Sequence, residues 1–136
     1  MSPLKTYLVE DSPVIRENLI ATLEELVPVR VVGTAEDEAT ALRWLYEAGE
    51  SLDLMIVDIF LRSGSGLGVL RAVQALPRRP HVVVLTNYAS PEMRRECLAL
   101  GADRVFDKSN EIDALVQYCA RLATRSDPRD VSPAPA

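Results

Sequence analysis

The pattern that most restricts the fold of this chain is a fivefold alternation of strand-like and helix-like segments. Short apolar runs rich in β-branched residues each precede a longer segment whose apolar residues recur at helical spacing, and no hairpin signal joins two runs. This alternation predicts an α/β fold in which helices cover both faces of a doubly wound, five-stranded parallel sheet. Right-handed crossovers favour the flavodoxin-like strand order 2-1-3-4-5.

The element boundaries follow from local signals. Ser12 before Pro13 and Ser90 before Pro91 each predict a helix start, because the serine hydroxyl accepts a free backbone N–H and proline suits the first helical position. The strands are predicted over residues 6–9, 29–33, 54–58, 81–86 and 104–106, and the last helix over 111–125. The apolar stripe expected for the first helix is Ile15, Leu19, Leu23 and Leu26.

Composition restricts the partners and the compartment. The net charge of -5 argues against direct nucleic-acid binding by this chain, because no basic patch is available to neutralise phosphates. No apolar stretch has the length of a membrane span or a signal peptide, so we expect no membrane association and a cytoplasmic protein. Cys97 and Cys119 lie in helical patterns without metal-ligand spacing and are interpreted as buried thiols. Residues 1–125 form one predicted domain, and the Pro/Ala-rich segment 126–136 is predicted to be a disordered tail or the start of a linker.

Carboxylates stand at the ends of two predicted strands. The apolar run 54–57 ends in Asp58, and the first strand runs into Glu10 and Asp11. In the expected strand order the first and third strands are neighbours, so these side chains converge at the carboxyl edge of the sheet, where ligands bind. Three close carboxylates repel one another unless a cation lies between them, and hard oxygen ligands suit Mg²⁺. Asp58 could then act as a nucleophile that forms an acyl phosphate.

The fourth and fifth strands also end in polar residues. Thr86 supplies a hydroxyl and Lys108 an ammonium, and both groups suit the oxygens of a transferred phosphoryl group. Taken singly, a threonine such as Thr86 is more often a strand-capping hydroxyl, and a lysine such as Lys108 is more often a solvated surface charge. Their occurrence together with the three carboxylates favours the phosphoryl site.

The set of strand ends resembles the receiver domain of bacterial two-component response regulators, in particular the stand-alone chemotaxis type. The resemblance covers residues 5–125. Its motifs are Glu10-Asp11, Ile56-Val57-Asp58, Val83-Val84-Leu85-Thr86, Phe106-Asp107-Lys108, Gly66 and Gly101-Ala102-Asp103.

The resemblance implies a phosphorylation-dependent switch. Asp58 would accept a phosphoryl group from a sensor histidine kinase or a phosphotransfer protein. Glu10, Asp11, Asp58 and the backbone carbonyl of Phe60 would hold Mg²⁺, and no other cofactor is implied. Thr86 and Lys108 would bind the phosphoryl group. The family phosphorylates itself from phosphodonors and slowly loses the phosphoryl group, so the chain is classed as a switch and not as an enzyme.

The chain departs from the family pattern at several positions. Val105 stands where an aromatic residue usually turns inward on activation, so the switch must use another device; Tyr88 and Phe106 are candidates. Phe60 and Tyr88 are bulky and are expected to restrict the hydrolytic water and slow dephosphorylation. Further departures are Arg62 and Ser109 in place of prolines, with Ser109 a candidate cap of the last helix, and Asn87 in place of a small residue.

Other functions are less well supported by the residues. Residues 64–68 resemble a nucleotide-binding glycine loop but lack its third glycine and follow the wrong strand. An FMN carrier would need a Ser/Thr-rich phosphate loop where this chain has Glu10 and Asp11. A phosphohydrolase of the haloacid dehalogenase type would need a second aspartate at position 60. His81 has no nucleophile beside it in sequence and is interpreted as structural.

The output of such a switch would be a protein surface formed by the fourth helix, the fifth strand and the fifth helix. Arg94, Arg95 and Glu96 make this surface charged, which favours a regulated docking site over a permanent dimer, although a weak homodimer on activation stays open. The downstream target cannot be read from the sequence. Two alternatives also stay open: the N-terminal receiver of a longer regulator, and a phosphate-independent binding module of the same fold.

Overall fold

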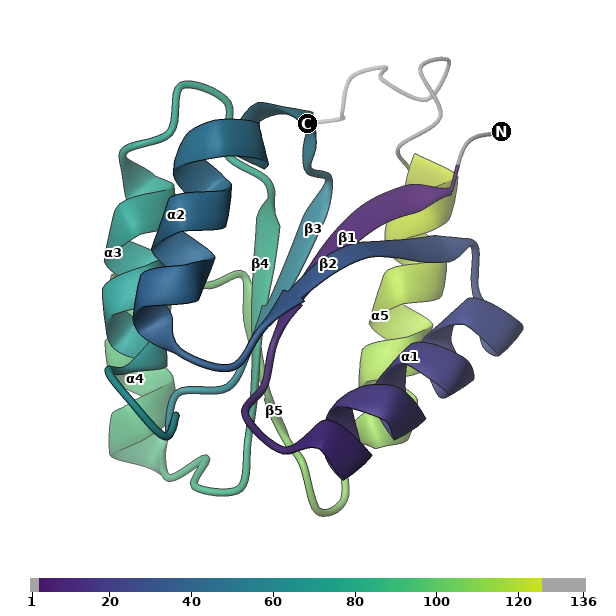
Figure 1. Cartoon of the computed structure of the whole chain (residues 1–136). Coiled ribbons are helices and arrows are strands. Elements are labelled where there is room, and N and C mark those ends of the chain that lie inside the picture. The colour runs from purple at the N-terminus through teal and green to yellow at the C-terminus, as the bar shows by residue number, and fades with distance from the viewer. Residues whose placement is uncertain (1–2, 126–136) are drawn as a thin grey trace, which may run out of the picture.

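The chain folds around a five-stranded parallel sheet with the strand order β2-β1-β3-β4-β5, as predicted (Figure 1). The structure is a computed structural model that describes residues 3–125, so the predicted tail 126–136 lies outside the described residues. The strands are β1 (Leu4–Val9), β2 (Val29–Ala35), β3 (Leu54–Val57), β4 (His81–Thr86) and β5 (Arg104–Asp107). The helices are α1 (Pro13–Leu26), α2 (Glu38–Ala48), α3 (Gly66–Gln74), α4 (Pro91–Ala99) and α5 (Ile112–Arg125), and a short 3₁₀ turn, η1 (Gly49–Ser51), follows α2.

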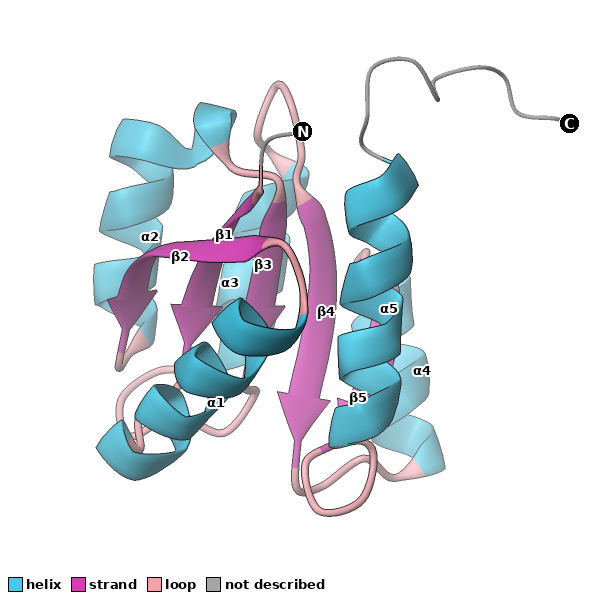
Figure 2. Cartoon of the chain, turned by 90° about the vertical axis from the view of Figure 1, so that its right-hand side faces the viewer, coloured by secondary structure: helices cyan, strands magenta, loops and turns pink. Residues whose placement is uncertain are grey.

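The helices cover the sheet in two layers. Helices α1 and α5 lie on one face, and α2, α3 and α4 lie on the other (Figures 1 and 2). Alternate residues of β3 enter the two cores: Leu54 and Ile56 pack with residues of α1 and α5, whereas Met55 and Val57 pack with residues of α2 and α3. Because both faces of the strand are buried, its four residues are all apolar and Asp58 is the first polar group after them.

Both predicted serine caps are present. The Ser12 hydroxyl accepts a hydrogen bond from the Ile15 amide at 3.3 Å, and Ser90 accepts one from Met93 at 3.1 Å. The predicted stripe of α1 is wrong at its last position, since Leu26 is 61% exposed. The helix ends at Leu26, and the next residue, Val27, is extended and buried in its place.

The amino end of the sheet carries an exposed contact between a histidine and an aspartate. His81 begins β4, and its Nδ1 lies 3.8 Å from Oδ2 of Asp103. The two side chains are 54% and 43% exposed. The same Asp103 oxygen accepts a hydrogen bond from the Val82 amide at 2.8 Å. His81 therefore lies at the solvated edge of the sheet, and its strand is buried from Val82 onward.

An aromatic stack covers the seam between β1 and β2. The rings of Tyr7 and Trp44 stack with their centroids 4.2 Å apart, and the Tyr7 hydroxyl donates to the carbonyl of Thr34 at 3.1 Å. Burial, helped by the charge of Asp37, raises the pKa of Tyr7 to about 12. Gly33 leaves room for this ring, since a Cβ there would come within 2.7 Å of it. The β1–β2 seam is therefore covered by one side chain from β1 and one from α2.

Both cysteines are buried free thiols, as predicted. Burial, with the nearby charge of Glu96, raises the pKa of Cys97 to about 11, and burial raises that of Cys119 to about 12, so neither is a ready thiolate. Within residues 3–125, no helix combines the length and the apolar character needed to cross a membrane.

Candidate functional site

The parallel pairing of β1 with β3 brings three carboxylates together at the carboxyl edge of the sheet. Val9 and Val57 are register partners, and the Asp58 amide donates to the Val9 carbonyl at 3.0 Å. One oxygen from each of Glu10, Asp11 and Asp58 lies within 4.8 Å of the others. Glu10 is 2% exposed and Asp58 7% exposed. The convergence expected from the strand order is thus present.

Lys108 reaches this cluster from the loop after β5. Its Nζ donates to Oε1 of Glu10 at 2.7 Å and to Oδ2 of Asp58 at 2.8 Å, and its side chain is only 9% exposed. Burial would lower the pKa of the ammonium, but the hydrogen bonds and charges of Asp58 and Glu10 outweigh burial and raise that pKa above its ordinary value. Lys108 is therefore a buried cation and not a solvated surface charge.

The second carboxylate oxygens of Glu10 and Asp58 accept hydrogen bonds from backbone amides. Oε2 of Glu10 accepts one from the Ser12 amide at 3.0 Å, and Oδ1 of Asp58 accepts one from the Phe60 amide at 3.2 Å. The site thus contains three carboxyl groups and one ammonium. Such an excess of acidic oxygens on loops fits a hard divalent cation, with Glu10, Asp11 and Asp58 as its side-chain ligands.

Thr86 ends β4 inside the protein. It is fully buried, and its Oγ1 accepts a hydrogen bond from the Tyr88 amide at 3.3 Å. Its carbonyl accepts the Lys108 amide at 2.9 Å, so the two predicted phosphoryl-binding residues are joined through the backbone. The fourth and fifth strand ends therefore lie side by side, as the sequence predicted.

Two exposed aromatic rings lie on the loops that follow Asp58 and Thr86. Phe60 and Tyr88 are 47% and 64% exposed, and their ring centroids are 4.8 Å apart in an edge-to-face arrangement. Aromatic pairs of this geometry attract each other beyond the area that they bury. The β3–α3 and β4–α4 loops are thereby held together next to the carboxylate cluster.

Gly66 allows the start of α3 to approach the backbone of Asp58. Its amide donates to the Ile59 carbonyl at 2.9 Å. A Cβ at position 66 would come within 2.2 Å of the Asp58 carbonyl oxygen, which is closer than side chains tolerate. The glycine singled out in the sequence motif thus has a steric reason.

Arg16 is a contributor to the site that sequence reasoning missed. Its Nη1 donates to the Glu10 carbonyl at 2.8 Å, and its Nη2 pairs with Oε2 of Glu36 at 3.3 Å. Arg62 also approaches Glu36, at 4.0 Å. The loops that follow β1, β2 and β3 are therefore linked by charged side chains. No periodicity signals this link, because it depends on how far a long side chain of α1 reaches back.

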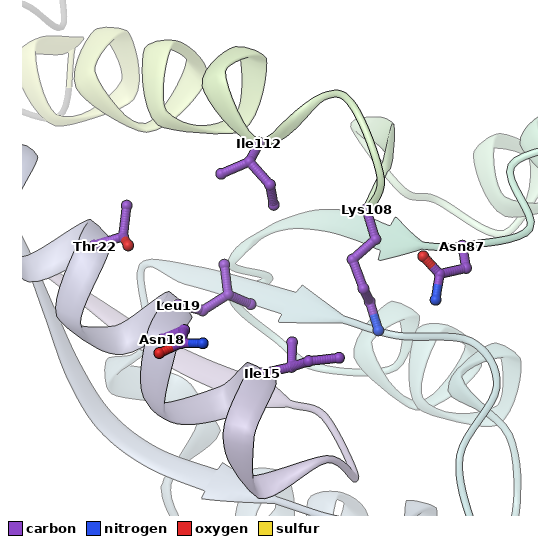
Figure 3. A pocket seen from close by; sticks show the side chains of 7 residues that line it. All are labelled: Ile15, Asn18, Leu19, Thr22, Asn87, Lys108 and Ile112. Carbon is purple, nitrogen blue, oxygen red and sulfur yellow. The ribbon is translucent and has the colours of Figure 1, made fainter.

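A groove of about 330 Å³ lies beside Lys108. Figure 3 shows Ile15 and Leu19 of α1 facing Ile112 of α5 across the groove, with Lys108 and Asn87 together at one side of it. Asn18 and Thr22 complete the α1 side. The groove thus leads along two helices to Lys108, which contacts the carboxylate cluster.

The positions that depart from the family pattern have distinct environments. Val105 is buried at 7% exposure. The Ser109 hydroxyl lies within hydrogen-bonding distance, 3.4 Å, of Oδ1 of Asn87, whereas α5 begins only at Ile112, so Ser109 does not cap that helix. Arg95 is exposed as predicted, but Arg94 turns inward and its Nη1 donates to the Val105 carbonyl at 2.8 Å. Arg94, which was expected to contribute charge to this surface, is 37% exposed and pairs with Glu111 at 2.9 Å.

The sequence and the fold are similar to those of known proteins. The chain is 29% identical over 99% of its length to the protein-glutamate methylesterase/protein-glutamine glutaminase 5 of Myxococcus xanthus, and 33% identical over 77% of its length to enzyme 1 of the same description from Syntrophus aciditrophicus. It spans 41% and 30% of these relatives, respectively. The signal receiver domain of a Luxo repressor protein from Vibrio parahaemolyticus matches its fold with a TM-score of 0.80, at 21% identity over 95% of this chain and 96% of that one.

The description of the matching family model is "Response regulator receiver domain", and the match extends over residues 7–120. These residues include all three members of the carboxylate cluster, and the sheet order agrees with that of the structural neighbours. Receiver domains are phosphoacceptor switches of two-component systems and interact with histidine kinases or phosphotransfer proteins. With its acidic cluster, its strand order and its sequence match in agreement, the chain belongs to the response regulator receiver domain family.

Proposed function

We propose that Asp58 is the phosphoacceptor of this receiver. The observation that carries the proposal is the position of its carboxylate. Asp58 directly follows the buried strand β3, is one of three close acidic groups, and lies 2.8 Å from the Lys108 ammonium. A carboxylate oxygen of Asp58 attacks the phosphorus of a phosphohistidine, and a P–O bond forms while the P–N bond breaks. The imidazole leaves with its electron pair and takes up a proton. The product is an aspartyl phosphate.

Lys108 and Thr86 bind the transferred group in this proposal. The Lys108 ammonium already contacts the Asp58 carboxylate, so its Nζ can pair with a phosphoryl oxygen attached there. The hydroxyl of Thr86 can donate to a second phosphoryl oxygen. Asp58 follows β3 and Thr86 ends the paired strand β4 at the same edge of the sheet, so a phosphoryl group on Asp58 lies near Thr86. The two residues thus oppose the charge that the phosphoryl group brings.

Mg²⁺ is the proposed cofactor, with Glu10, Asp11, Asp58 and the Phe60 carbonyl as its ligands. The close acidic oxygens at loop positions support this choice. When bound, Mg²⁺ supplies positive charge against the phosphoryl oxygens. The hydrogen bond from the Ser12 amide to the Glu10 carboxylate and that from Arg16 to the Glu10 carbonyl hold Glu10 in place.

The phosphodonor protein is proposed to dock along the groove between α1 and α5. The groove leads to Lys108 and carries apolar Ile15, Leu19 and Ile112, which suit the side of a helix that presents a phosphohistidine. Replacing Thr22 by Arg should lower phosphotransfer from a phosphorylated histidine phosphotransfer domain at least tenfold and leave labelling by acetyl phosphate unchanged. Equal loss with both donors would contradict docking at this groove.

Phe60 and Tyr88 are proposed to slow the loss of the phosphoryl group. Their paired rings are exposed on the loops beside Asp58 and restrict the approach of water. The Phe60→Ala and Tyr88→Ala variants should each lose phosphate several-fold faster, as followed by intact mass after removal of the donor. Unchanged decay in both variants would refute the shielding. Apart from labelling itself from phosphodonors and this slow hydrolysis, no enzymatic activity is proposed.

The output is proposed to be a protein contact made by the surface of α4, β5 and α5, with a weak homodimer only in the phosphorylated state. The acidic composition, with a net charge of -5, supports a protein target over nucleic acid. Two buried free thiols suit a reducing compartment, so we place the protein in the cytoplasm. Sedimentation with and without a phosphoryl mimic would test the dimer.

The central experiment combines Mg²⁺ with acetyl phosphate or beryllofluoride. We expect a mass gain of one phosphoryl group with acetyl phosphate, and amide shifts at the site with beryllofluoride. Both responses should require Mg²⁺ and vanish in Asp58→Asn. The matched control is Asp113→Asn, an exposed aspartate of α5 outside the cluster. A wild-type protein without these responses would refute the proposal and favour a phosphate-independent binding module.

A further inference from the structure

Arg94 joins three separate segments of the α4–β5–α5 region. Its Nε donates to the Ala89 carbonyl at 3.1 Å, its Nη1 to the Val105 carbonyl at 2.8 Å, and its Nη2 to Oε1 of Glu111 at 2.9 Å. The side chain is 37% exposed, so much of it is in contact with protein. One guanidinium on α4 is therefore bonded to the β4–α4 loop, to β5 and to the residue that precedes α5.

Glu111 extends this connection to the loop that carries Lys108. The same Oε1 atom accepts the Asp107 amide at 2.7 Å. The hydrogen bond from Arg94, with a further contribution from the Asp107 amide, holds the pKa of Glu111 below its ordinary value. Asp107 directly precedes Lys108, whose amide is in turn bonded to the Thr86 carbonyl. Arg94 and Glu111 thus fix the backbone from which Lys108 enters the site.

The three acceptors of Arg94 are each close in sequence to a residue of the site or of the expected switch. Ala89 is three residues after Thr86, and Glu111 is three residues after Lys108. A guanidinium is planar, so its donors have a fixed geometry. It cannot keep all three bonds when the two loops move relative to each other. A displacement of either loop must therefore break a bond or move Arg94, and with it α4.

We infer that Arg94 couples the phosphorylation site to the exposed surface of α4, in a role that Val105 cannot fill because it has no aromatic ring to turn. The inference rests on the proposed phosphorylation of Asp58. Arg94 acts as a positioning residue: it contacts neither the carboxylate cluster nor Lys108 itself, but it holds the two loops that present Thr86 and Lys108. Movement of the two loops on phosphorylation is passed to α4 through the three hydrogen bonds.

The test is amide NMR of the full chain with Mg²⁺, before and after addition of beryllofluoride, in wild type and in Arg94→Gln. The matched control is Arg95→Gln, which removes the same charge from the next residue of α4, at an exposed position. We expect the amides of Asp58 and Lys108 to shift in all three proteins. The shifts of the α4 amides should be at least twofold smaller in Arg94→Gln than in wild type and in Arg95→Gln.

The outcomes distinguish a failure of the coupling through Arg94 from a failure of the proposed phosphorylation of Asp58. Site amides that do not respond in wild type would refute phosphorylation at Asp58, and the coupling with it. The coupling alone would be refuted if the site amides respond in all three proteins and the α4 shifts are as large in Arg94→Gln as in wild type. If amide dispersion shows that Arg94→Gln is unfolded, Arg94→Lys serves in its place. Its single ammonium keeps the charge but cannot bond to all three acceptors, so the same loss of α4 shifts is expected.

Discussion

The two ends of the sheet pair acidic and basic side chains in opposite ways. At the carboxyl end, Lys108 bonds to Glu10 and Asp58 at 2.7 and 2.8 Å, and the three side chains are 9%, 2% and 8% exposed. At the amino end, His81 and Asp103 are 3.8 Å apart and about half exposed. Water reaches about half of each side chain in the second pair, but the buried groups of the first must be satisfied within the protein.

The difference in burial between the two pairs shows that the cost of burying charged groups falls at the carboxyl end of the sheet. Exposed ion pairs contribute little to stability, and burying charges is costly unless they are matched. The carboxyl end holds two buried carboxyl groups and the partly buried Asp11 against one ammonium, so its charges are not matched. Such an imbalance is expected at a functional site and not in an element that serves stability. The following predictions test that contrast, beginning with the largest effect.

Lys108→Met should destabilise the protein most. It removes the cation from between two buried carboxylates, and breaking a buried pair in this way costs about 3 kcal/mol. Urea unfolding in the presence of a chelator measures this change in the free energy of unfolding. Lys5→Met, at an exposed position of β1, is the control and should change it by less than about 0.5 kcal/mol. Equal effects of the two substitutions would mean that the buried cluster is no more sensitive than the surface.

Gly66→Ala should cost about 2 kcal/mol, because the added Cβ overlaps the Asp58 carbonyl and the backbone must shift. The same shift should slow labelling by acetyl phosphate. Gly68→Ala is the control, since the atoms nearest to its Cβ would be those of the Glu38 carboxyl group, the end of a flexible side chain that can move away. A larger drop in the denaturation temperature for Gly68→Ala than for Gly66→Ala would contradict the steric role of Gly66.

Asp58→Asn should act in the opposite direction and stabilise the metal-free protein by about 1 kcal/mol. It removes one of three close acidic groups and leaves Lys108 paired with Glu10, so repulsion falls more than attraction. The comparison is made in a chelator by urea unfolding of wild type and variant. A loss of stability of similar size would show that the attraction between Asp58 and Lys108 outweighs the repulsion.

His81→Gln should have the smallest effect, below about 0.5 kcal/mol, because the pair that it removes is long and solvated. The variant leaves Asp103 free to keep its bond to the Val82 amide. Thermal denaturation should therefore give a curve close to that of wild type. A loss as large as that in Lys108→Met would remove the distinction between the two ends of the sheet.

The sequence contained enough to predict the sheet and the convergence of its strand ends. A parallel sheet places every strand's carboxyl end at the same edge, so the positions of Glu10, Asp11 and Asp58 follow from strand order alone. Thr86 and Lys108 follow from the same rule. The contacts of Lys108 with the carboxylates were not needed for that prediction, because the backbone determines which side chains share the edge.

Contacts made by long side chains could not be predicted in this way. Arg94 and Arg95 are adjacent arginines on one helix, yet the first bonds to three segments and the second is exposed. Arg16 likewise reaches back to the Glu10 carbonyl from α1. A guanidinium at the end of several rotatable bonds finds its acceptors through tertiary packing, which hydrophobic periodicity does not describe. Leu26 was mispredicted for a related reason, since the periodic pattern continues to the helix end while the core does not.

The stacking of Trp44 on Tyr7 gives the protein an internal optical probe. Trp44 is the single tryptophan of the chain, and its partner Tyr7 lies on β1, the strand that leads into Glu10. Strand β1 pairs with both β2 and β3, so loss of the sheet separates the two rings and transfers the indole to water. Intrinsic fluorescence should consequently report unfolding of the strands that build the site in every variant described above, without an added label.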